Sequence, residues 1–374
     1  MDLPSEKQLN IVVPMAGRGS RFAQAGFLKP KPLIPLGGIP MIQWVIRNVR
    51  PNRRHRFIFV CLKEHLVANP DVPQTLIRLC PGCEIVGVDQ VTEGAACTVL
   101  LAREHIDNES PLMIANSDQF VDLPIDRYLV AMDDPGVGGL IMTFWADHPK
   151  WSYCRMRADG TVAEVVEKKV ISREATVGLY NFSHGRDFVW SAEEMIRRNL
   201  RTNNEFYVAP TYNILIERGY KVVVRQTGRE YAGMYGLGTP EDYEFFQTTA
   251  AFRRRCPREY ISPYSSETLR LKKRTEIGIR FFNDRNRAGI EALLHPNVIL
   301  TSGSGCVSGR AAVVDRFEML FVKNARCELQ LANALTAANT TAVRFEGRGG
   351  DMNLSSLSNL TWEDDLIRGI DSSY

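Results

Sequence analysis

Runs of apolar residues alternate with segments of helical period through the first two thirds of the chain. The segments IVVPM, RFIFVCL, CEIVGV and PLMIA have the apolar composition of buried strands. Between them, PMIQWVIRNV places Met41, Ile42, Val45, Ile46 and Val49 at helical spacing, and GAACTVLLAREHI and IDRYLVAMD also read as helices. This order predicts an α/β fold with a mainly parallel, doubly wound sheet that is covered by helices on both faces.

The pattern changes after residue 150. The segment YCRMRADGTVAEVVEKK turns at Asp159-Gly160, which predicts an antiparallel hairpin inserted into the parallel architecture. TVGLYNF and KVVVRQT read as further strands, and DFVWSAEEMIRRNL and PTYNILIERG read as helices. TPEDYEFFQTTAAFRRR predicts one last helix, with Thr239 as its N-cap and Pro240 in its first position.

A chain of 374 residues exceeds what one hydrophobic core usually supports, so we expect two domains. Residues 256–275 are rich in Pro, Ser and charge and have no sustained period, which is typical of a linker. Beyond them, EIGIRFFNDRNRAGIEALL is helical in pattern, and CELQLANAL and TTAVRFEG are strand-like. We therefore expect one domain over residues 1–255, a linker over 256–275 and a smaller α+β domain over 276–374.

The composition is that of a globular protein, with 44% hydrophobic and 24% charged residues. The net charge of +3 gives no global field that would favour nucleic acid or a membrane surface as partner. The N-terminus lacks the apolar core of a signal peptide and no run is long enough to span a membrane, so we expect a cytoplasmic protein. Cys80 and Cys83 form a single CxxC without a second pair, so free thiols are favoured over zinc.

A glycine-containing turn follows the first strand in PMAGRGSRF. Gly17 and Gly19 let the main chain approach a ligand, and Arg18 and Arg21 lie beside them. The dinucleotide pattern GxGxxG fails at Phe22, and the Walker pattern is absent. A structural turn and a phosphate site are therefore equally open on these residues. The next segment, LKPKPLIPL, holds Lys31 between prolines, and a rigid lysine beside such a turn suits a polyphosphate.

PMAGRGSRF followed by KPKPLIPLGGIPMI resembles the signature of the nucleotidyltransferases that activate sugar 1-phosphates, such as glucose-1-phosphate thymidylyl-, uridylyl- and cytidylyltransferases. The resemblance continues through scattered motifs to about residue 252 and implies their GT-A-like, Rossmann-like sheet. It assigns Arg21 and Lys31 to catalysis, and it assigns the nucleotide phosphates to the turn residues Ala16, Gly17, Gly19 and Ser20.

Later segments match further motifs of the same family, in the expected order. They are VTEGAACTVLLA at the nucleotide base, MIANSDQF at the metal, VVEKK at the sugar phosphate and NNEFYVAPTYN on the acceptor side. The resemblance thereby implicates Glu93 and Gly94 in base binding, Asp118 in Mg²⁺ binding and catalysis, and Glu167, Lys168, Glu205 and Asn213 in acceptor binding.

Without the family resemblance, the three carboxylates Asp118, Glu167 and Glu205 could each have a purely structural role. Asp118 at a strand end could cap a following helix, Glu167 could end an exposed charged strand, and Glu205 could lie on the surface. The chain also departs from the family where a second metal-binding aspartate is expected, because MYGLGTPED has Gly236 at that position. Asp242 should not be assumed to replace it, so we expect Asp118 to be the one protein carboxylate on the metal, with phosphates and water as the other ligands.

These residues suggest an enzyme in which an acceptor phosphate attacks the α-phosphorus of CTP, UTP or dTTP and pyrophosphate leaves. The acceptor would be a sugar 1-phosphate or a similar phosphorylated small molecule, for cell-surface polysaccharide precursors. One alternative is a cytidylyltransferase for a phosphorylated non-sugar, which PMAG and Gly236 favour. Another is a non-catalytic nucleotide sensor, against which Arg21, Lys31 and Asp118 argue together. The sequence names neither the base nor the acceptor.

Residues 276–374 resemble the nuclear-transport-factor-2-like, or SnoaL-like, fold, in which helices close over a curved, cone-shaped sheet. Some relatives use a buried Asp–His pair there, but His295 precedes Pro296 at a helix end and Asp315 lies in a helical stretch. We therefore expect a non-catalytic domain that promotes homo-oligomerisation, with ligand binding in its pocket as the alternative. We also expect a protein ending near residue 255 to remain active.

Overall fold

The computed structural model describes residues 7–257, 266–302, 305–323, 328–337, 340–349 and 352–373. The chain divides into two compact units. The N-terminal unit comprises Met1–Arg229 and Gly233–Pro240, and the C-terminal unit comprises Glu230–Ala232 and Glu241–Tyr374. None of the described helices is long and apolar enough to cross a membrane.

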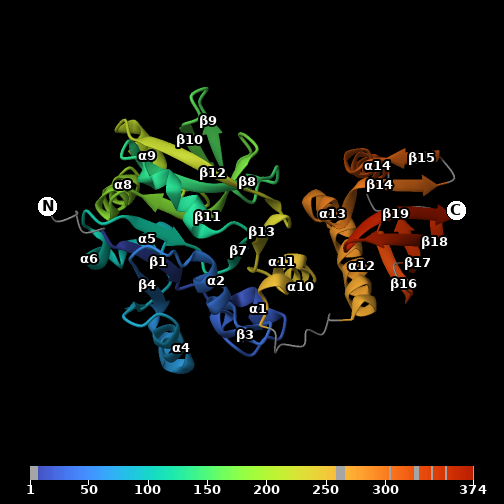
Figure 1. The fold of residues 1–374 in the computed structure, drawn as a ribbon, viewed down its shortest axis with the longest axis horizontal. Helices are drawn as coiled ribbons and strands as arrows, with labels where there is room; N and C mark the ends of the chain where they lie inside the picture. Colours follow the sequence, from blue (N-terminus) through green and yellow to red (C-terminus); the bar gives the residue numbers. More distant parts are fainter. Residues whose placement is uncertain are drawn as a thin grey trace. The chain divides into compact units, whose positions relative to one another are not determined.

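An 11-stranded sheet forms the centre of the N-terminal unit (Figure 1). Its main path runs β5-β4-β1-β6-β11-β8-β12-β13-β7, and the hairpin of β9 and β10 branches from β11. Pairing is parallel from β5 to β6, whereas β11 lies antiparallel to both of its neighbours on this path. The strands are β1 (Leu9–Met15), β4 (His55–Leu62), β5 (Glu84–Val88), β6 (Leu112–Ala115), β7 (Gln119–Val121), β8 (Val137–Trp145), β9 (Ser152–Met156), β10 (Val162–Glu167), β11 (Glu174–Phe182), β12 (Lys221–Glu230) and β13 (Gly233–Gly236).

Alternate residues of β1 enter two hydrophobic cores, with Ile11 and Val13 in one and Val12 in the other. Helices α2 and α4 pack into the first core, and α5, α8 and α9 pack into the second, so helices cover both faces as predicted. The elements of this unit outside the main sheet are α1 (Ser20–Gln24), the 3-10 turn η1 (Lys31–Leu33), β2 (Pro35–Leu36), β3 (Ile39–Pro40), α2 (Met41–Val49), α3 (Lys63–Ala68), α4 (Asp71–Leu79), α5 (Ala95–Leu100), α6 (Arg103–Ile106), α7 (Ile125–Leu129), η2 (Val130–Asp133), α8 (Gly185–Arg197) and α9 (Thr211–Glu217).

The C-terminal unit is α+β, as expected. Its six-stranded sheet has the order β15-β14-β19-β18-β17-β16, in which only the β14–β19 pair is parallel. The elements are α10 (Pro240–Gln247), α11 (Ala250–Arg255), α12 (Glu267–Asn283), α13 (Arg287–Leu293), β14 (Leu294–Ser302), β15 (Gly305–Ser308), α14 (Arg310–Lys323), β16 (Glu328–Ala337), β17 (Thr340–Gly349), β18 (Met352–Glu363) and β19 (Leu366–Ser373).

The junction differs from the sequence-based expectation in two respects. Residues 267–275, assigned to a linker, form the first half of α12, whose buried face includes Arg274 and Thr275 and therefore lacks a clean apolar period. The single helix expected over residues 239–255 is two helices, because the hydroxyl of Thr249 caps α11 by accepting from the Phe252 amide at 3.2 Å. Apart from Pro240, both helices belong to the C-terminal unit rather than to the N-terminal one.

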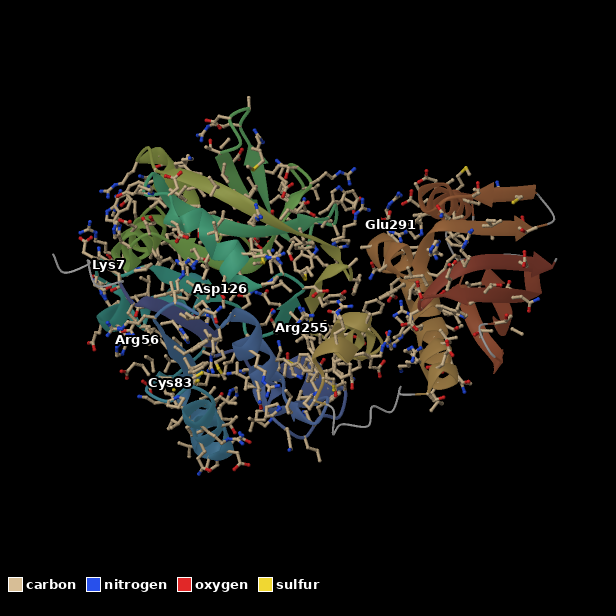
Figure 2. The ribbon with its side chains drawn as sticks, in the orientation of Figure 1. Lys7, Arg56, Cys83, Asp126, Arg255 and Glu291 are labelled. Atoms are coloured by element: carbon tan, nitrogen blue, oxygen red, sulfur yellow. The ribbon has the colours of Figure 1, made fainter. Side chains whose placement is uncertain are left out.

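The described cysteines carry free thiols. In the CxxC segment, burial raises the pKa of Cys80 to about 11 and also raises the pKa of Cys83, which is labelled in Figure 2. Both are therefore neutral thiols at pH 7.

Candidate active site

The glycine turn lies open at the end of β1. A Cβ at Gly17 would meet no atom within 4 Å, so the main chain is accessible there. Gly19 has a φ of +63°, and a Cβ on it would lie 3.2 Å from the Cβ of Lys31. Ala16 is buried below the turn, and Ser20 is exposed at the start of α1. The turn and Lys31 are therefore in direct contact, as the motif predicts.

Lys31 and Asp118 form an ion pair across 87 positions of sequence. The Lys31 Nζ donates to Asp118 Oδ2 at 2.6 Å, and the two side chains keep 19% and 34% of their surface exposed. The Lys31 Nζ also lies 6.0 Å from the centroid of the Phe22 ring. A pair this accessible adds little stability, so its importance is that it places a cation and a carboxylate beside the turn.

Asp118 is not a helix cap. It lies between β6 and β7, so a strand rather than a helix follows it. Its carbonyl oxygen accepts from the Leu237 amide at 2.7 Å, and a Cβ on Gly238 would lie 3.0 Å from its Oδ2. Gly236 pairs with Gln119 in the β13–β7 ladder. The position of the missing second aspartate is therefore next to Asp118, as the resemblance implies.

Three residues beside Asp118 are not among those predicted from the sequence: Asn116, Gln119 and Gly178. Gly178 has a φ of +102°, and a Cβ on it would lie 2.2 Å from Asn116 Nδ2 and 2.8 Å from Gln119 Oε1. It occupies an irregular stretch of β11, between Thr176 and Tyr180, where the register shifts. A glycine inside the strand-like segment TVGLYNF is the signal that could have indicated this close approach.

The two segments assigned to the base and the acceptor are joined by main-chain hydrogen bonds. The Phe206 amide donates to the Glu93 carbonyl at 2.7 Å, and the Ala96 amide donates to the Phe206 carbonyl at 3.0 Å. Gly94 has a φ of +126°, and a Cβ on it would lie 2.4 Å from the Phe206 oxygen, so only glycine permits this contact. The Glu93 carboxylate itself pairs with Arg201 at 3.0 Å.

Glu167 is a buried carboxylate at the end of β10, not an exposed strand end. Its exposure is 8%, and the Ser152 hydroxyl donates a short hydrogen bond to its Oε2. The Lys168 Nζ lies 3.7 Å from its Oε1. Burial raises the pKa of Glu167, and the hydrogen bonds from Ser152 and Lys168 offset only part of that effect.

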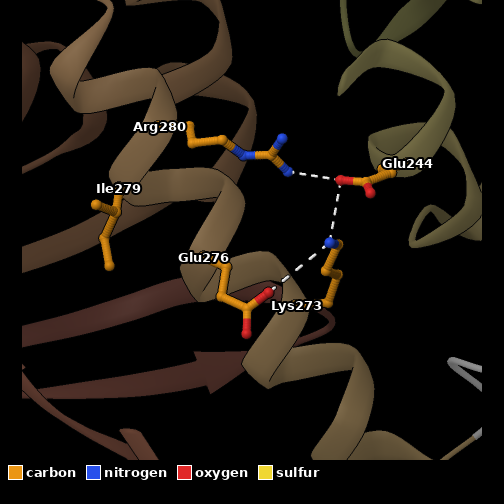
Figure 3. Close-up of a pocket in the computed structure, with 5 residues that line it drawn as sticks. All are labelled: Glu244, Lys273, Glu276, Ile279 and Arg280. Atoms are coloured by element: carbon orange, nitrogen blue, oxygen red, sulfur yellow. Dashed lines mark hydrogen bonds and ion pairs between the residues drawn. The ribbon is translucent and has the colours of Figure 1, made fainter. Parts of the chain in front are cut away.

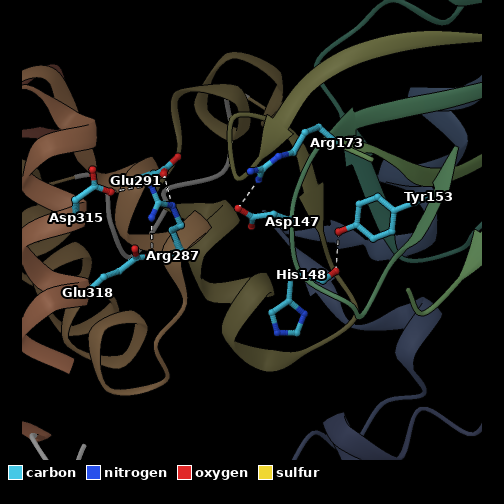
Figure 4. Close-up of polar contacts among 8 residues, drawn as sticks. All are labelled: Asp147, His148, Tyr153, Arg173, Arg287, Glu291, Asp315 and Glu318. Atoms are coloured by element: carbon cyan, nitrogen blue, oxygen red, sulfur yellow. Dashed lines mark hydrogen bonds and ion pairs between the residues drawn. The ribbon is translucent and has the colours of Figure 1, made fainter. Parts of the chain in front are cut away.

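Lys168 is held in an uncommon conformation beside this carboxylate. Its φ is +58°, its Nζ donates to the Lys150 carbonyl at 3.0 Å, and the same Nζ lies 5.6 Å from the centroid of the Tyr207 ring. The loop before β9 is tied down nearby, because the Tyr153 hydroxyl donates to the His148 carbonyl at 2.7 Å (Figure 4). The structure therefore brings together Lys168, the aromatic ring of Tyr207 and the Ser152–Glu167 pair.

Glu205 and Asn213 differ in how they are placed. Glu205 is exposed, and burial together with its hydrogen bond to Tyr207 raises the pKa of that phenol. The side-chain amide of Asn213 makes two hydrogen bonds to the main chain of Val165. Its Oδ1 accepts from the Val165 amide and its Nδ2 donates to the Val165 carbonyl, each at 2.8 Å. Glu205 thus borders the Glu167 cluster, while Asn213 secures the edge of β10; their roles as acceptor contacts stay predictions.

The C-terminal unit shows no Asp–His pair among the residues that the structure describes. Asp315 pairs with Arg287 at 3.3 Å (Figure 4), whereas His295 Nδ1 accepts from the Asn297 amide at 3.1 Å. Asp242 accepts from the Tyr231 hydroxyl at 3.1 Å within the same unit.

Comparisons with known proteins agree with this description. Residues 11–158 match the MobA-like NTP transferase domain, and residues 279–370 match a SnoaL-like domain. The chain is 26% identical over 239 residues to the bifunctional protein GlmU of Paraburkholderia xenovorans (strain LB400), covering 60% of this chain and 48% of the relative. It therefore spans about half the length of the curated relatives it matches.

Among solved structures, the nucleoside-diphosphate-sugar pyrophosphorylase from Vibrio cholerae RC9 superimposes with a TM-score of 0.56 at 25% identity, over 63% of this chain and 98% of that one. The inositol-1-phosphate CTP transferase from T. maritima shares the fold, with a TM-score of 0.50 at 14% identity over 64% of this chain and 95% of that one. Residues 11–158 are thus similar to NTP transferase domains and residues 279–370 to SnoaL-like domains, in agreement with the resemblance and the fold class predicted from the motifs.

Proposed function

We propose that the N-terminal unit joins the nucleotidyl group of a nucleoside triphosphate to a phosphorylated acceptor. An acceptor phosphate oxygen attacks the α-phosphorus, the bond from the α-phosphorus to its bridging oxygen breaks, and pyrophosphate leaves. The observation that carries the proposal is the Lys31–Asp118 pair set directly against the open turn of Gly17 and Gly19. The nucleoside triphosphate and the acceptor phosphate are both anionic and repel each other, so a site that brings them together needs nearby cations such as those of residues 16–31.

Charge neutralisation is the main task of these side chains. Residues 16–31 carry Arg18, Arg21, Lys29 and Lys31 and no acidic residue. In the described part of the chain, Lys31 alone among these four makes an ion pair. Arg21 and the amides of the turn would hold the β- and γ-phosphates, and Lys31 would stabilise the charge that spreads over the α-phosphate oxygens in the transition state.

The donor set around Asp118 fits Mg²⁺ held mainly by substrate. No group of three or more His, Cys, Asp or Glu side chains suited to a metal occurs among the described residues. Asp118, a partly exposed carboxylate, would supply the one protein ligand, and phosphate oxygens and water would supply the rest. When bound, Mg²⁺ would neutralise charge on the phosphate oxygens of the reactants. Asp118 would orient it, and Lys31 would then be released from Asp118 toward the α-phosphate.

The acceptor is best matched by a sugar 1-phosphate or a similar hydroxylated phosphate. The buried Glu167 can accept a hydrogen bond from a hydroxyl group, and Lys168 offers a cation to a phosphate. A phosphorylated non-sugar with CTP is the second candidate, because Gly236 removes the second carboxylate that the sugar enzymes use. Supply of precursors for cell-surface polysaccharides is the corresponding proposal for the biological role.

The test measures pyrophosphate release by the full chain with CTP, UTP, dTTP, ATP and GTP against a panel of phosphorylated acceptors. One nucleotide with one hydroxylated acceptor should give turnover that requires Mg²⁺. Binding of a nucleotide without release of pyrophosphate for any acceptor would instead identify a nucleotide sensor.

Homo-oligomerisation through the C-terminal unit is a separate proposal. Its basis is the SnoaL-like match over residues 279–370. Light scattering on the full chain tests it, and a monomeric mass would contradict it.

A further inference from the structure

A cavity lies at the amino ends of the parallel strands of the N-terminal unit. It measures about 390 Å³ and is lined by Gln8, Arg50 and residues 55–57 and 80–82, which precede or begin β1, β4 and β5. β1 is seven residues long, so about 20 Å of strand separates this amino-end cavity from the glycine turn. Ligands of open α/β sheets bind at the carboxyl ends of the strands. The cavity is therefore separate from the proposed transferase site.

The segment that leads into β4 is strongly basic. Residues 50–56, RPNRRHR, carry four arginines and one histidine and no acidic residue. Arg53 is paired with a carboxylate of η2 at 3.1 Å, and Arg54 is exposed outside the cavity lining. Arg50 and Arg56 line the cavity. Two guanidinium groups are thus concentrated at one place.

The guanidinium of Arg50 is oriented by neutral acceptors. Its Nη2 donates to the Leu79 carbonyl at 2.6 Å and to Cys80 Sγ at 3.2 Å, and its Cζ lies 5.6 Å from the centroid of the Phe57 ring. Cys80 is a neutral thiol, because burial raises its pKa to about 11. These contacts fix the direction of the Arg50 side chain and leave its charge uncompensated.

The guanidinium of Arg56, which is labelled in Figure 2, is also held by neutral groups. Its Nε donates to Asn10 Oδ1 at 2.7 Å, and its Nη2 donates to the His105 carbonyl at 2.8 Å. Asn10 is 2% exposed, and its Nδ2 has no hydrogen-bond partner among the described residues, so Asn10 orients Arg56 at a cost in stability. In the part of the chain that the structure describes, neither Arg50 nor Arg56 forms an ion pair with a carboxylate.

His55 and Phe57 complete the lining at the start of β4. His55 Nδ1 lies 2.8 Å from the Arg53 carbonyl, which can only accept, so Nδ1 donates and Nε2 is the ring nitrogen left to meet a ligand. The Phe57 ring lies edge to face with the His55 ring, with the centroids 5.6 Å apart. The cavity thus combines two guanidinium groups and an imidazole with an aromatic surface.

A hollow on the C-terminal unit has the opposite charge arrangement (Figure 3). It measures about 280 Å³ and is lined by Glu244, Lys273, Glu276, Ile279 and Arg280. Glu244 Oε2 lies 3.0 Å from Lys273 Nζ and 2.7 Å from Arg280 Nη2, and Lys273 also pairs with Glu276 at 3.7 Å. The cations of this hollow are balanced by its own carboxylates, so it has no excess charge to attract an ion.

From these contacts we infer that the amino-end cavity binds a phosphate monoester, a small molecule that carries one phosphate group. A phosphate dianion accepts charge-assisted hydrogen bonds from two guanidinium groups, which present their N–H groups in a planar fork. The volume of about 390 Å³ is within the range of small-molecule sites, so an organic group fits beside the phosphate and against Phe57. The inference concerns the N-terminal unit alone and does not depend on the transferase reaction.

The test measures binding of phenyl phosphate to the full chain by calorimetry, with inorganic phosphate and benzyl alcohol as comparison ligands. Arg50→Gln and Arg56→Gln each remove one guanidinium group from the cavity. Arg54→Gln is the matched control, because it removes the same charge from the same segment at an exposed position outside the lining. Thermal unfolding without ligand checks the fold of each variant. If Arg56→Gln does not fold, Arg50→Gln decides, since its side chain is exposed.

Arg50→Gln and Arg56→Gln should each weaken binding of phenyl phosphate about tenfold or more, the scale of losing a hydrogen bond to a charged group, while Arg54→Gln should bind like the wild type. In the wild type, phenyl phosphate should slow hydrogen exchange of the main-chain amides in residues 54–57 and 79–83. It should also bind more tightly than inorganic phosphate, and benzyl alcohol should not bind.

Three results would overturn the inference: no binding to the wild type, equal affinity of the wild type and the folded cavity variants, or slowed exchange confined to residues 16–31. Equal affinity for phenyl phosphate and inorganic phosphate would overturn the assignment to an ester and identify a site for free phosphate. All of these measurements are made without turnover, so failure of the transferase proposal would leave them interpretable.

Discussion

Ionic side chains are arranged in opposite ways around Lys31 in the N-terminal unit and around Arg287 in the C-terminal unit. Lys31 shares residues 16–31 with three further cations and faces the one carboxylate of Asp118. Arg287 faces three carboxylates, those of Glu291, Asp315 and Glu318. An excess of cations is costly unless an anion arrives, whereas a saturated arginine needs no ligand. The comparison supports the proposal that residues 16–31 bind phosphate, whereas the carboxylates around Arg287 already balance its charge.

Replacing the single carboxylate should have the largest effect. Asp118→Asn should lower Mg²⁺-dependent turnover by about 100-fold or more, the scale of losing a preorganised electrostatic group, while nucleotide binding persists through the cations and the turn. Pyrophosphate release across a Mg²⁺ titration, together with nucleotide binding by calorimetry, measures both. Full activity of the variant, or of the wild type in excess chelator, would contradict the assignment of Asp118.

Removal of Lys31 should lower turnover nearly as much as the Asp118 substitution, whereas removal of the nearby Lys29 should not. Lys31→Ala should lower kcat by about 100-fold, since its ammonium would stabilise charge on the α-phosphate, and folding should change little because the ion pair is partly exposed. Lys29→Ala is the matched control two residues away, with an exposed side chain, and should be mild. Equal kinetics in the two variants would remove Lys31 from the mechanism.

The buried carboxylate of Glu167, which we propose to contact the acceptor, should make the stability of the protein depend on pH. Because burial raises the pKa of Glu167 above its unfolded value, its charged form destabilises the fold, and this penalty grows as the pH rises through the folded pKa. Glu167→Gln should therefore raise the unfolding temperature at pH 7 more than at pH 4, while raising the KM for the acceptor. Glu205→Gln, at an exposed site, is the control for the thermal effect. A lower stability of Glu167→Gln at pH 7 would contradict the assignment.

Low pH should destabilise the C-terminal unit, whereas it removes the destabilising charge of Glu167 in the N-terminal unit. We expect this effect to be the smallest of the four that are predicted here. Burial alone would raise the pKa of Glu244 and of Asp365, but hydrogen bonds from Arg280 and Lys273, and from Arg270 and Arg253, lower both. Their contribution to stability is present above the unfolded pKa values, near 4.5 and 3.8, and is lost as the pH falls below them.

Calorimetric scans of the full chain between pH 7 and pH 3 test this expectation. The transition of the C-terminal unit should move to lower temperature below about pH 4.5, and it should move less in the Glu244→Gln, Asp365→Asn double variant. The same shift in both proteins would show that other groups control the acid response.

Local chemistry made much of the N-terminal unit predictable from sequence. The apolar runs that became β1, β4 and β6 are buried on both faces of the sheet, so their composition alone distinguishes them from amphipathic helices. Gly19 is needed where the main chain takes a left-handed conformation, and Lys31 is stiffened by neighbouring prolines. The turn at Gly17 and Gly19 and the stiff segment around Lys31 each depend on neighbouring residues alone, and the order of the motifs is read directly from the sequence. These features could therefore be predicted without the structure.

The tertiary structure decided what depends on distant partners. Asp118 is followed by a strand because β7 pairs with β13, which lies more than a hundred residues later in the chain. Gly178 is needed because Asn116 approaches its main chain closely. Likewise α10 and α11 read as the end of the first domain because their residues are contiguous with it, yet Phe245 packs on Phe281 and Glu244 pairs with Arg280. Packing and ion pairing are interactions between surfaces in space, so a local pattern can show that a face will be buried but not which segment buries it.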